Sequence, residues 1–168
     1  IQSSLIDLID ASLVSTKKLS NNRVLFLGPP NTGKSSLFNR LLGFERALVS
    51  SVPGTTRDLI DSEMFYNSIN MELVDSAGVR DTDDLVEAEG VALSGNEIPE
   101  SALILIVLDH VTESLAGVFK SMVIGKNHLM VFNKSDETNP VEDYDCVVSA
   151  KSGSGIQELK KMVFNSIQ

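Results

Sequence analysis

The sequence has no tryptophan, a single cysteine and few basic residues: 14 Lys and Arg stand against 23 Asp and Glu, so its 168 residues carry a formal charge of −9. One thiol, Cys146, cannot form a disulfide within the chain, and we interpret it as a small hydrophobic core residue. A chain that needs no disulfide is expected in the cytoplasm. The shortage of Lys and Arg argues against nucleic-acid binding through this chain's own charge, because phosphate contacts need those residues.

Long apolar segments are also missing. The longest apolar run, residues 102–108, has the length of a strand and is too short to cross a bilayer. Residues 1–10 lack the basic start and the apolar stretch of a secretory signal. We therefore expect no membrane segment and interpret the N-terminus as the start of a piece of a longer protein. A hydrophobic content of 42% excludes a disordered chain, and the length fits one domain with a full core.

The beginning of the chain predicts an amphipathic helix. Apolar residues recur at helical spacing from Leu5 to Leu13, with Asp and Ser between them. We expect residues 1–22 to form a leading helix that joins a neighbouring domain absent from this chain, although such a helix could also pack on its own domain. Residues 23–168 then form a single domain.

Short apolar runs separated by helix-length segments continue to the end of the chain. This alternation is typical of a mostly parallel sheet covered by helices on both faces. We therefore predict a three-layer α/β fold with one antiparallel hairpin strand. The expected strands span residues 24–27, 64–66, 71–74, 102–108, 129–132 and 146–148, the expected helices residues 35–42 and 156–167, and the hairpin turn residues 67–70.

A glycine-rich sequence, G-P-P-N-T-G-K-S over residues 28–35, lies between the first predicted strand and the first of these helices. It fits the pattern G-x-x-x-x-G-K-[ST] of a loop whose backbone N–H groups surround phosphate oxygens. In that pattern Lys34 contacts the β- and γ-phosphates, and Ser35 offers a hydroxyl to Mg²⁺. The flanking strand and helix favour a phosphate-binding loop over a chance glycine-rich turn capped by Ser35.

Two further motifs indicate which base is bound. N-K-S-D at residues 133–136 follows a predicted strand, where the Asp136 carboxylate can accept the N1–H and N2–H₂ donors of guanine. Asn133 and Lys134 can hold this loop and cover the face of the base. S-A-K at residues 149–151 follows another strand and matches a backbone N–H contact to guanine O6. Each motif alone could be an ordinary polar turn, but their order after a phosphate loop favours GTP over ATP.

Two more loops offer groups for a metal ion and for the γ-phosphate. D-S-A-G at residues 75–78 follows a strand, so Asp75 can hold Mg²⁺ through water and the Gly78 N–H can approach the γ-phosphate. Upstream, G-T-T-R-D at residues 54–58 offers the hydroxyl of Thr56 to complete the Mg²⁺ shell. Loss of the γ-phosphate would release the loop at Gly78, as in other order–disorder switches.

These residues resemble the translation-factor-related GTPases and, in detail, the G domain of the MnmE/TrmE tRNA-modification GTPases. The resemblance covers nearly the whole chain and lies in G-P-P-N-T-G-K-S-S-L-F-N-R-L-L, A-L-V-S-S-V-P-G-T-T-R-D and V-D-S-A-G-V-R. It implies a P-loop GTPase (Ras-like) G domain that hydrolyses GTP to GDP and phosphate. It also implies a conformational switch in tRNA wobble-uridine modification. The partners implied are a second copy paired through the G domains in the GTP state, a flavin-containing MnmG/GidA-type protein, and tRNA bound by other domains or by that partner.

Hydrolysis needs a residue that orients the attacking water, and Val79 stands where Ras-like proteins have Gln. The acidic candidates in the segment that follows are Asp81, Asp83, Asp84, Glu87 and Glu89. The resemblance selects Glu87 among them, although an acidic residue in such a run is often only a solvated side chain. The residues that it implies for hydrolysis are Lys34, Thr56, Gly78 and Glu87.

The resemblance also implies a K⁺ ion in place of an arginine finger, because a cation between the β- and γ-phosphates offsets charge that develops in the transition state. The side-chain oxygen of Asn31 would bind this ion, and backbone carbonyls of the loop over residues 50–56 would fold over it. Asn31 could equally form a stabilising Asx turn. The ligands implied for K⁺ are Asn31, Ser50, Val52 and Thr55, and those implied for Mg²⁺ are Ser35, Thr56 and Asp75.

Two other functions stay open on the sequence. A ribosome-assembly GTPase of the Era or EngA type shares P-N-x-G-K-S, and a module that binds guanine nucleotide without hydrolysing it is compatible with Val79. In all three cases the same residues contact the nucleotide. They are Asn31, Thr32, Gly33, Lys34, Ser35, Ser36, Asn133, Lys134, Asp136, Ser149, Ala150 and Lys151.

Overall fold

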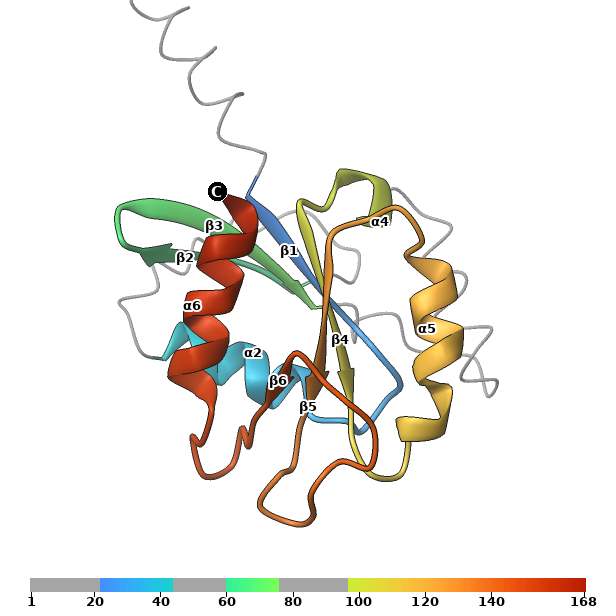
Figure 1. The fold of residues 1–168 in the computed structure, drawn as a ribbon. Coiled ribbons are helices and arrows are strands. Elements are labelled where there is room, and N and C mark those ends of the chain that lie inside the picture. Colours follow the sequence, from blue (N-terminus) through green and yellow to red (C-terminus); the bar gives the residue numbers. More distant parts are fainter. Residues whose placement is uncertain (1–21, 44–59, 76–96) are drawn as a thin grey trace, which may run out of the picture.

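Six strands form one sheet in the computed structural model, which describes residues 22–43, 60–75 and 97–168 (Figure 1). Their order across the sheet is β2-β3-β1-β4-β5-β6, and every neighbouring pair is parallel except β2 with β3. The predicted mostly parallel sheet with one antiparallel hairpin strand is thereby confirmed. The strands are β1 (Arg23–Leu27), β2 (Ile60–Tyr66), β3 (Ile69–Asp75), β4 (Leu103–Leu108), β5 (His128–Phe132) and β6 (Cys146–Val147).

Helices cover both faces of this sheet, which gives the three layers that the sequence predicts. The described helices are α2 (Lys34–Leu42), α4 (Glu97–Glu100), the 3₁₀ turn η2 (Glu113–Leu115), α5 (Ala116–Met122) and α6 (Ile156–Ile167). Helices α2 and α6 pack on one face, and α4 and α5 pack on the other (Figure 1). The predicted leading helix lies outside the described residues. Within the described part of the chain, no helix has the length and apolar character needed to cross a membrane.

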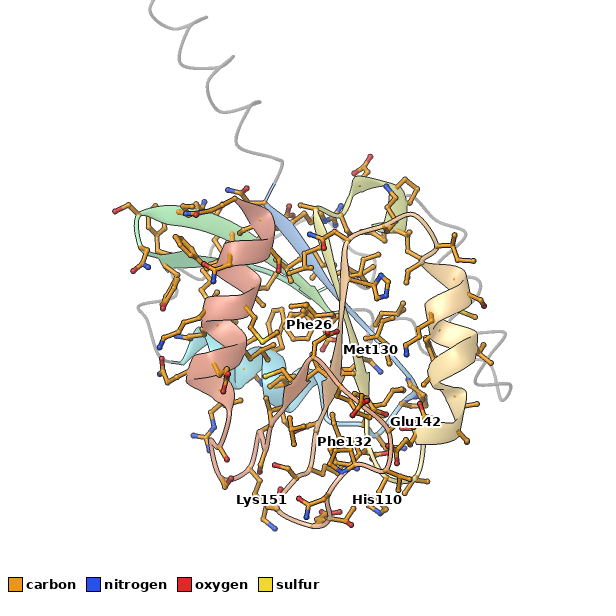
Figure 2. All side chains as sticks on the ribbon, in the orientation of Figure 1. Phe26, His110, Met130, Phe132, Glu142 and Lys151 are labelled. Atoms are coloured by element: carbon orange, nitrogen blue, oxygen red, sulfur yellow. The ribbon has the colours of Figure 1, made fainter. Side chains whose placement is uncertain are left out.

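The central strands are apolar on both sides because each side faces a helix layer. In β1, Val24 and Phe26 belong to the core under α2 and α6, whereas Leu25 and Leu27 belong to the core under α4 and α5. Strand β4 buries every side chain that it carries. Figure 2 shows Phe26 inside the molecule, where its ring meets Phe38 of α2 edge to face at 5.6 Å. Continuous apolar runs are expected for parallel strands buried in this way.

The hairpin differs from its prediction in both length and turn. Strand β2 begins at Ile60 rather than at residue 64, and the turn consists of Asn67 and Ser68 alone, since Tyr66 already pairs with Ile69. Both turn residues have positive φ, +48° and +67°. Two-residue turns with positive φ match the twist of antiparallel strands. Asn adopts this conformation readily, but Ser gives little signal for it, and the four-residue turn predicted over 67–70 is therefore wrong.

The lone thiol behaves as the sequence indicates. Cys146 is 5% exposed and packs in the core under α2 and α6. Burial raises the pKa of its thiol to about 11. An apolar site that holds the thiol protonated makes it a poor nucleophile, which confirms Cys146 as a core residue.

Candidate guanine-nucleotide site

All the parallel strands end at one edge of the sheet, and the loops that follow them carry the predicted site. This edge lies at the lower end of the molecule in Figure 2, where His110 follows β4 and Lys151 follows β6. In open parallel sheets ligands bind at the carboxyl ends of the strands. The fold therefore brings together loops that are far apart in the sequence.

Two glycines allow the phosphate loop, residues 28–35, to lie against its neighbours. Gly28 has a φ of +145°, and a Cβ atom there would come within 2.2 Å of the Val107 carbonyl oxygen on β4. Gly33 has a φ of +85°, and its Cβ would come within 2.4 Å of Asn133 Nδ2. Both positions combine a left-handed backbone with close approach, so only Gly fits either of them. The glycines of the motif are thus explained by packing as well as by access of phosphate to the backbone.

The side chain of Lys34 lies inside this loop. It is 3% exposed, and its ammonium donates hydrogen bonds to the carbonyl oxygens of Gly28 and, at 2.6 Å, of Pro29. The hydroxyl of Thr32 donates to the Pro29 oxygen at 3.0 Å. Helix α2 begins at Lys34, so its N-terminal N–H groups and positive dipole end also face the loop. A buried cation beside a helix N-terminus suits a phosphate anion.

Ser35 and Asp75 fit a magnesium ion. Ser35 is the last residue of the phosphate loop, Asp75 ends β3, and the Ser35 hydroxyl donates to Asp75 Oδ2 at 2.7 Å. A hydroxyl and a carboxylate oxygen at this separation can serve one small hard cation, directly or through water. No group of three or more His, Cys, Asp or Glu side chains that could hold a metal occurs in the described part of the chain. Mg²⁺ usually keeps waters and shares its shell with substrate phosphates, so few protein ligands are needed. Thr56, the third predicted ligand, lies outside the described residues.

Asn133 joins three loops of the site. It is 1% exposed, its Nδ2 donates to the Thr32 carbonyl oxygen at 2.8 Å, and its Oδ1 accepts the backbone N–H of Ala150 at 3.0 Å. The N-K-S-D sequence predicts a holding role for Asn133, and the structure places this residue between the phosphate loop and the S-A-K loop. Ala150 belongs to the S-A-K sequence, which is predicted to offer a backbone N–H to guanine O6, and its own N–H donates to Asn133 in this structure.

The carboxylate of Asp136 is held in place by the S-A-K loop. The Ser149 hydroxyl donates to Asp136 Oδ1 at 2.6 Å, and Lys151 Nζ lies 3.6 Å from Oδ2. The Ser149 hydrogen bond, supported by the nearby Lys151, lowers the pKa of Asp136 below its ordinary value. The group is therefore ionised at neutral pH and accepts hydrogen bonds only, which suits the two adjacent N–H donors of guanine.

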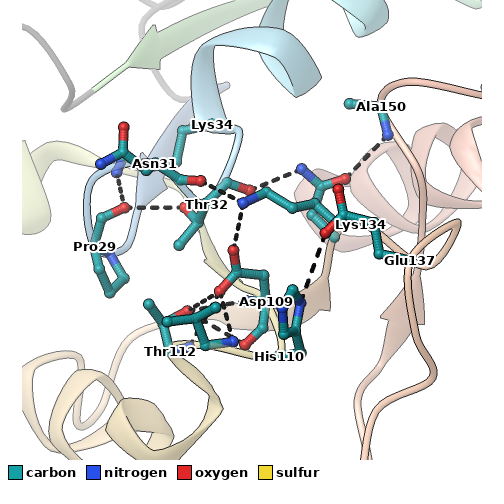
Figure 3. Close-up of polar contacts among 12 residues, drawn as sticks. Pro29, Asn31, Thr32, Lys34, Asp109, His110, Thr112, Lys134, Glu137 and Ala150 are labelled. Atoms are coloured by element: carbon teal, nitrogen blue, oxygen red, sulfur yellow. Dashed lines mark hydrogen bonds and ion pairs between the residues drawn. The ribbon is translucent and has the colours of Figure 1, made fainter.

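The ammonium of Lys134 has two hydrogen-bond partners that the sequence did not predict. Its backbone is left-handed, with φ +63°, and its ammonium donates to the Asn31 carbonyl at 2.7 Å and to Asp109 Oδ2 at 2.6 Å (Figure 3). Asp109 directly follows β4 and is 2% exposed. In the sequence it marks only the end of an apolar run. An acidic residue at the carboxyl end of a buried strand is the signal that could have identified it.

Arg40 is a second residue that sequence reasoning missed. It lies on α2 near its C-terminal end, and its guanidinium donates to the carbonyl oxygens of Ala150 at 2.9 Å and Lys151 at 2.6 Å. The planar fork of Arg holds two successive carbonyls at once. Arg40 thus fixes the S-A-K loop to the helix that begins at the phosphate loop.

We expect Arg40→Lys to weaken GDP binding about fivefold, because Lys cannot donate to both carbonyls in this geometry and one hydrogen bond is lost. Isothermal titration calorimetry with GDP and Mg²⁺ measures the dissociation constant. Asn39→Ala, at the neighbouring exposed position of α2, is the matched control and should bind GDP as the wild type does. An unchanged dissociation constant in Arg40→Lys would show that the fork does not support the site.

The remaining predicted positions divide into two groups. Ser36 is exposed and lines a shallow pocket together with Asn39, Arg40 and Gly43. The other positions lie outside the described residues, and the structure does not place them. They are Ser50, Val52, Thr55, Thr56, Gly78 and Glu87.

Comparisons with known proteins agree with this geometry. Residues 23–134 match the family model described as 50S ribosome-binding GTPase. The chain is 41% identical over 152 residues to tRNA modification GTPase MnmE of Geobacter sulfurreducens, a match that covers 85% of this chain and 33% of that protein. It is 37% identical over 175 residues to tRNA modification GTPase MnmE of Thermosipho melanesiensis, which covers 99% of this chain and 40% of that protein.

A solved structure shows the same fold. The G domain of the T. maritima FeoB iron transporter aligns with a TM-score of 0.63 at 24% identity, covering 87% of this chain and 98% of that one. At this identity the likeness concerns the fold alone. The curated relatives are longer, and the chain spans 33% and 40% of the length of the two named above.

Proposed function

The chain belongs to the 50S ribosome-binding GTPase family, and from this premise we propose that it is the GTP-hydrolysing switch of a tRNA modification enzyme. Family membership confirms the expected GTPase domain, and the similarity to tRNA modification GTPases confirms the resemblance to the MnmE/TrmE group. The tRNA context is proposed from those relatives, since the chain spans only part of their length.

The observation that carries the nucleotide assignment is the joining of the phosphate loop to both guanine loops by Asn133. One buried side chain bonds Thr32 and Ala150, so the residues for phosphate and for base form one unit. A chance glycine-rich turn would have no reason to be fixed to an N-K-x-D sequence. Binding of phosphate and recognition of guanine are therefore coupled in this fold.

The described residues have distinct tasks in the proposed reaction. Lys34 holds its ammonium where it can contact the β- and γ-phosphates, while Asp136 selects the base. Ser35 and Asp75 would hold Mg²⁺, which when bound neutralises charge on the phosphate oxygens. Because the ammonium already lies within the loop, little reorganisation of the protein is needed when charge develops on the phosphates.

We further propose that K⁺ stimulates hydrolysis and that two copies pair through their nucleotide faces in the GTP state. Support comes from the chemistry of Asn31, from the G-T-T-R-D sequence and from Val79 in place of Gln. Asn31 has φ +65°, and its carbonyl accepts Lys134, which fixes the backbone of the residue proposed to bind K⁺. Glu87 is proposed to orient water, and Ser50, Val52 and Thr55 to complete the K⁺ site.

Turnover of GTP should be several-fold faster in K⁺ than in Na⁺ at equal ionic strength, and Glu87→Ala should lower it at least about tenfold in K⁺. Replacing K⁺ by Na⁺ removes the cation that fits between the two phosphates, and Glu87→Ala removes the group that orients water. Phosphate release measures turnover, and the molecular mass in GDP with aluminium fluoride tests pairing.

Glu89→Ala is the matched control, because it removes the same charge from the same segment. It should turn over GTP at the wild-type rate. Equal rates in K⁺ and Na⁺, or full activity of Glu87→Ala, would contradict the proposed mechanism and would leave GTP binding to be judged by calorimetry. We propose that the full-length protein acts in the cytoplasm on tRNA held by its other domains, together with a flavin-containing partner.

The description of the matched family favours one other function, a GTPase that acts on the large ribosomal subunit. Cosedimentation of the full-length protein with 50S subunits in the presence of GTP separates the two functions. Binding to the subunit without any effect on tRNA wobble modification would support the ribosomal role. The charge of −9 argues that RNA contacts, in either case, lie outside this chain.

A further inference from the structure

The two carboxylate oxygens of Asp109 have separate partners. Oδ1 accepts the backbone N–H groups of Val111 at 3.2 Å and Thr112 at 3.1 Å, and the Thr112 hydroxyl at 2.8 Å. These bonds shape the turn that follows β4. Oδ2 instead accepts the ammonium of Lys134 at 2.6 Å. One buried side chain therefore organises its own turn with one oxygen and contacts the N-K-x-D loop with the other (Figure 3).

The contact with Lys134 is electrostatically strong. The side chain of Asp109 is 3% exposed, whereas that of Lys134 is 29% exposed. Burial alone would raise the pKa of Asp109, but hydrogen bonds from Lys134 and Thr112 and the charge of Lys134 outweigh burial and lower it. A charge-assisted hydrogen bond in such surroundings is short and about twice as strong as a neutral one. Asp109 is therefore ionised and fixes the ammonium.

Lys134 passes this constraint to the phosphate loop. The same ammonium donates to the Asn31 carbonyl oxygen at 2.7 Å, so Asp109, Lys134 and Asn31 form a chain of contacts from β4 to the loop around the phosphates. The left-handed backbone of Lys134 places its side chain across this gap. Nearby, His110 and Glu137 approach each other at 3.9 Å at exposed positions and do not join the chain of contacts.

We propose that Asp109 is a positioning residue for guanine nucleotides, which holds Lys134 in place and thereby couples the base loop to the phosphate loop. This inference rests on the proposed function, since it deepens the same site. Asp109 does not contact the nucleotide; it acts through Lys134. The competing explanation is that Asp109 only stabilises its own turn, and the division between its two oxygens allows the two explanations to be separated.

The test is Asp109→Asn in the 168-residue chain, assayed by calorimetry with GDP and Mg²⁺. The Asn oxygen can keep the turn bonds of Oδ1, while its NH₂ group, a donor, faces the ammonium. We expect GDP binding to weaken about tenfold, because a charge-assisted hydrogen bond is lost. In a Lys134→Met background the same substitution should change GDP affinity by less than about twofold. Asp109 then has no ammonium to hold, so its interaction with residue 134 no longer contributes.

Thr112→Val is the matched control for the turn. It removes the hydroxyl that Oδ1 accepts, leaves Lys134 untouched, and should bind GDP as the wild type does even if its unfolding temperature falls. If Asp109→Asn does not fold, Asp109→Glu takes its place, because it keeps the charge but displaces it. Its GDP affinity is then measured in the wild-type and Lys134→Met backgrounds.

The positioning role would be overturned if an Asp109 variant weakened GDP binding equally in the wild-type and Lys134→Met backgrounds. It would also be overturned if Thr112→Val weakened GDP binding as much as Asp109→Asn does. Wild-type affinity in Asp109→Asn would overturn it too. If the wild-type chain does not bind GDP at all, the proposed function is overturned as well. If the wild-type chain binds GDP, a negative result for the Asp109 variants overturns the positioning role alone.

Discussion

Asp136→Asn is expected to weaken GDP binding about 1,000-fold and to create binding of xanthosine diphosphate, because a site built to pair with particular N–H donors strongly rejects a mismatched base. The Asp136 carboxylate offers two acceptors to N1–H and N2–H₂. In the variant, Oδ1 can still accept the Ser149 hydroxyl, which donates to it at 2.6 Å in the wild type. The amide nitrogen then takes the other position and donates to the C2 carbonyl that xanthine has in place of the guanine amino group.

Competitive calorimetry with GDP and xanthosine diphosphate measures both affinities in the same protein. Glu137→Gln is the matched control, because it neutralises the adjacent acidic residue of the same loop, which is exposed and lies 3.9 Å from His110. The control should keep the wild-type preference for GDP. Asp136→Asn with unchanged GDP affinity would show that Asp136 does not contact the base.

The fold could be predicted because the signal is local and repeated. Continuous apolar strands such as β4 follow from burial on both faces, and α6 ends where its helical spacing of apolar residues ends. The phosphate loop is equally local, since its glycines and Lys34 stand in one short sequence. The hairpin turn was mispredicted because Ser68 adopts a positive φ that its residue type does not favour.

Two supports of the site, Arg40 and Asp109, were not predicted, because each is a contact between distant parts of the chain. Arg40 bonds carbonyl oxygens that lie more than a hundred positions later, and Asp109 bonds Lys134 from a different strand. The position of Asp109 at the end of a buried strand is a signal for the residue, but no sequence window shows that its partner is Lys134 or that Arg40 bonds the S-A-K loop. The sequence predicts the groups expected to contact the ligand, whereas the structure adds groups that hold those residues in place. Glu87 and the K⁺ loop lie outside the described residues and stay predictions.

Lys34→Ala is expected to lower GTP hydrolysis by about 1,000-fold, in line with the loss of a preorganised positive group at the position where charge develops. Lys34 is the buried cation of the phosphate loop, and its ammonium donates to the carbonyl oxygens of Gly28 and Pro29 within that loop. Its removal takes away the contact to both the β- and the γ-phosphate. GTP affinity should therefore fall more than GDP affinity, since GDP loses only one of those contacts.

Single-turnover phosphate release at saturating GTP separates this effect from weak binding. Lys120→Ala on α5 is the matched control, because it removes one positive charge from an exposed position on the opposite face of the sheet. It should hydrolyse GTP at the wild-type rate, because Lys120 lies on α5, away from the phosphate loop, while the net charge changes as in Lys34→Ala. A Lys34→Ala protein that hydrolyses GTP within about threefold of wild type would contradict the role of the loop, since a preorganised donor at the reacting group contributes far more than that.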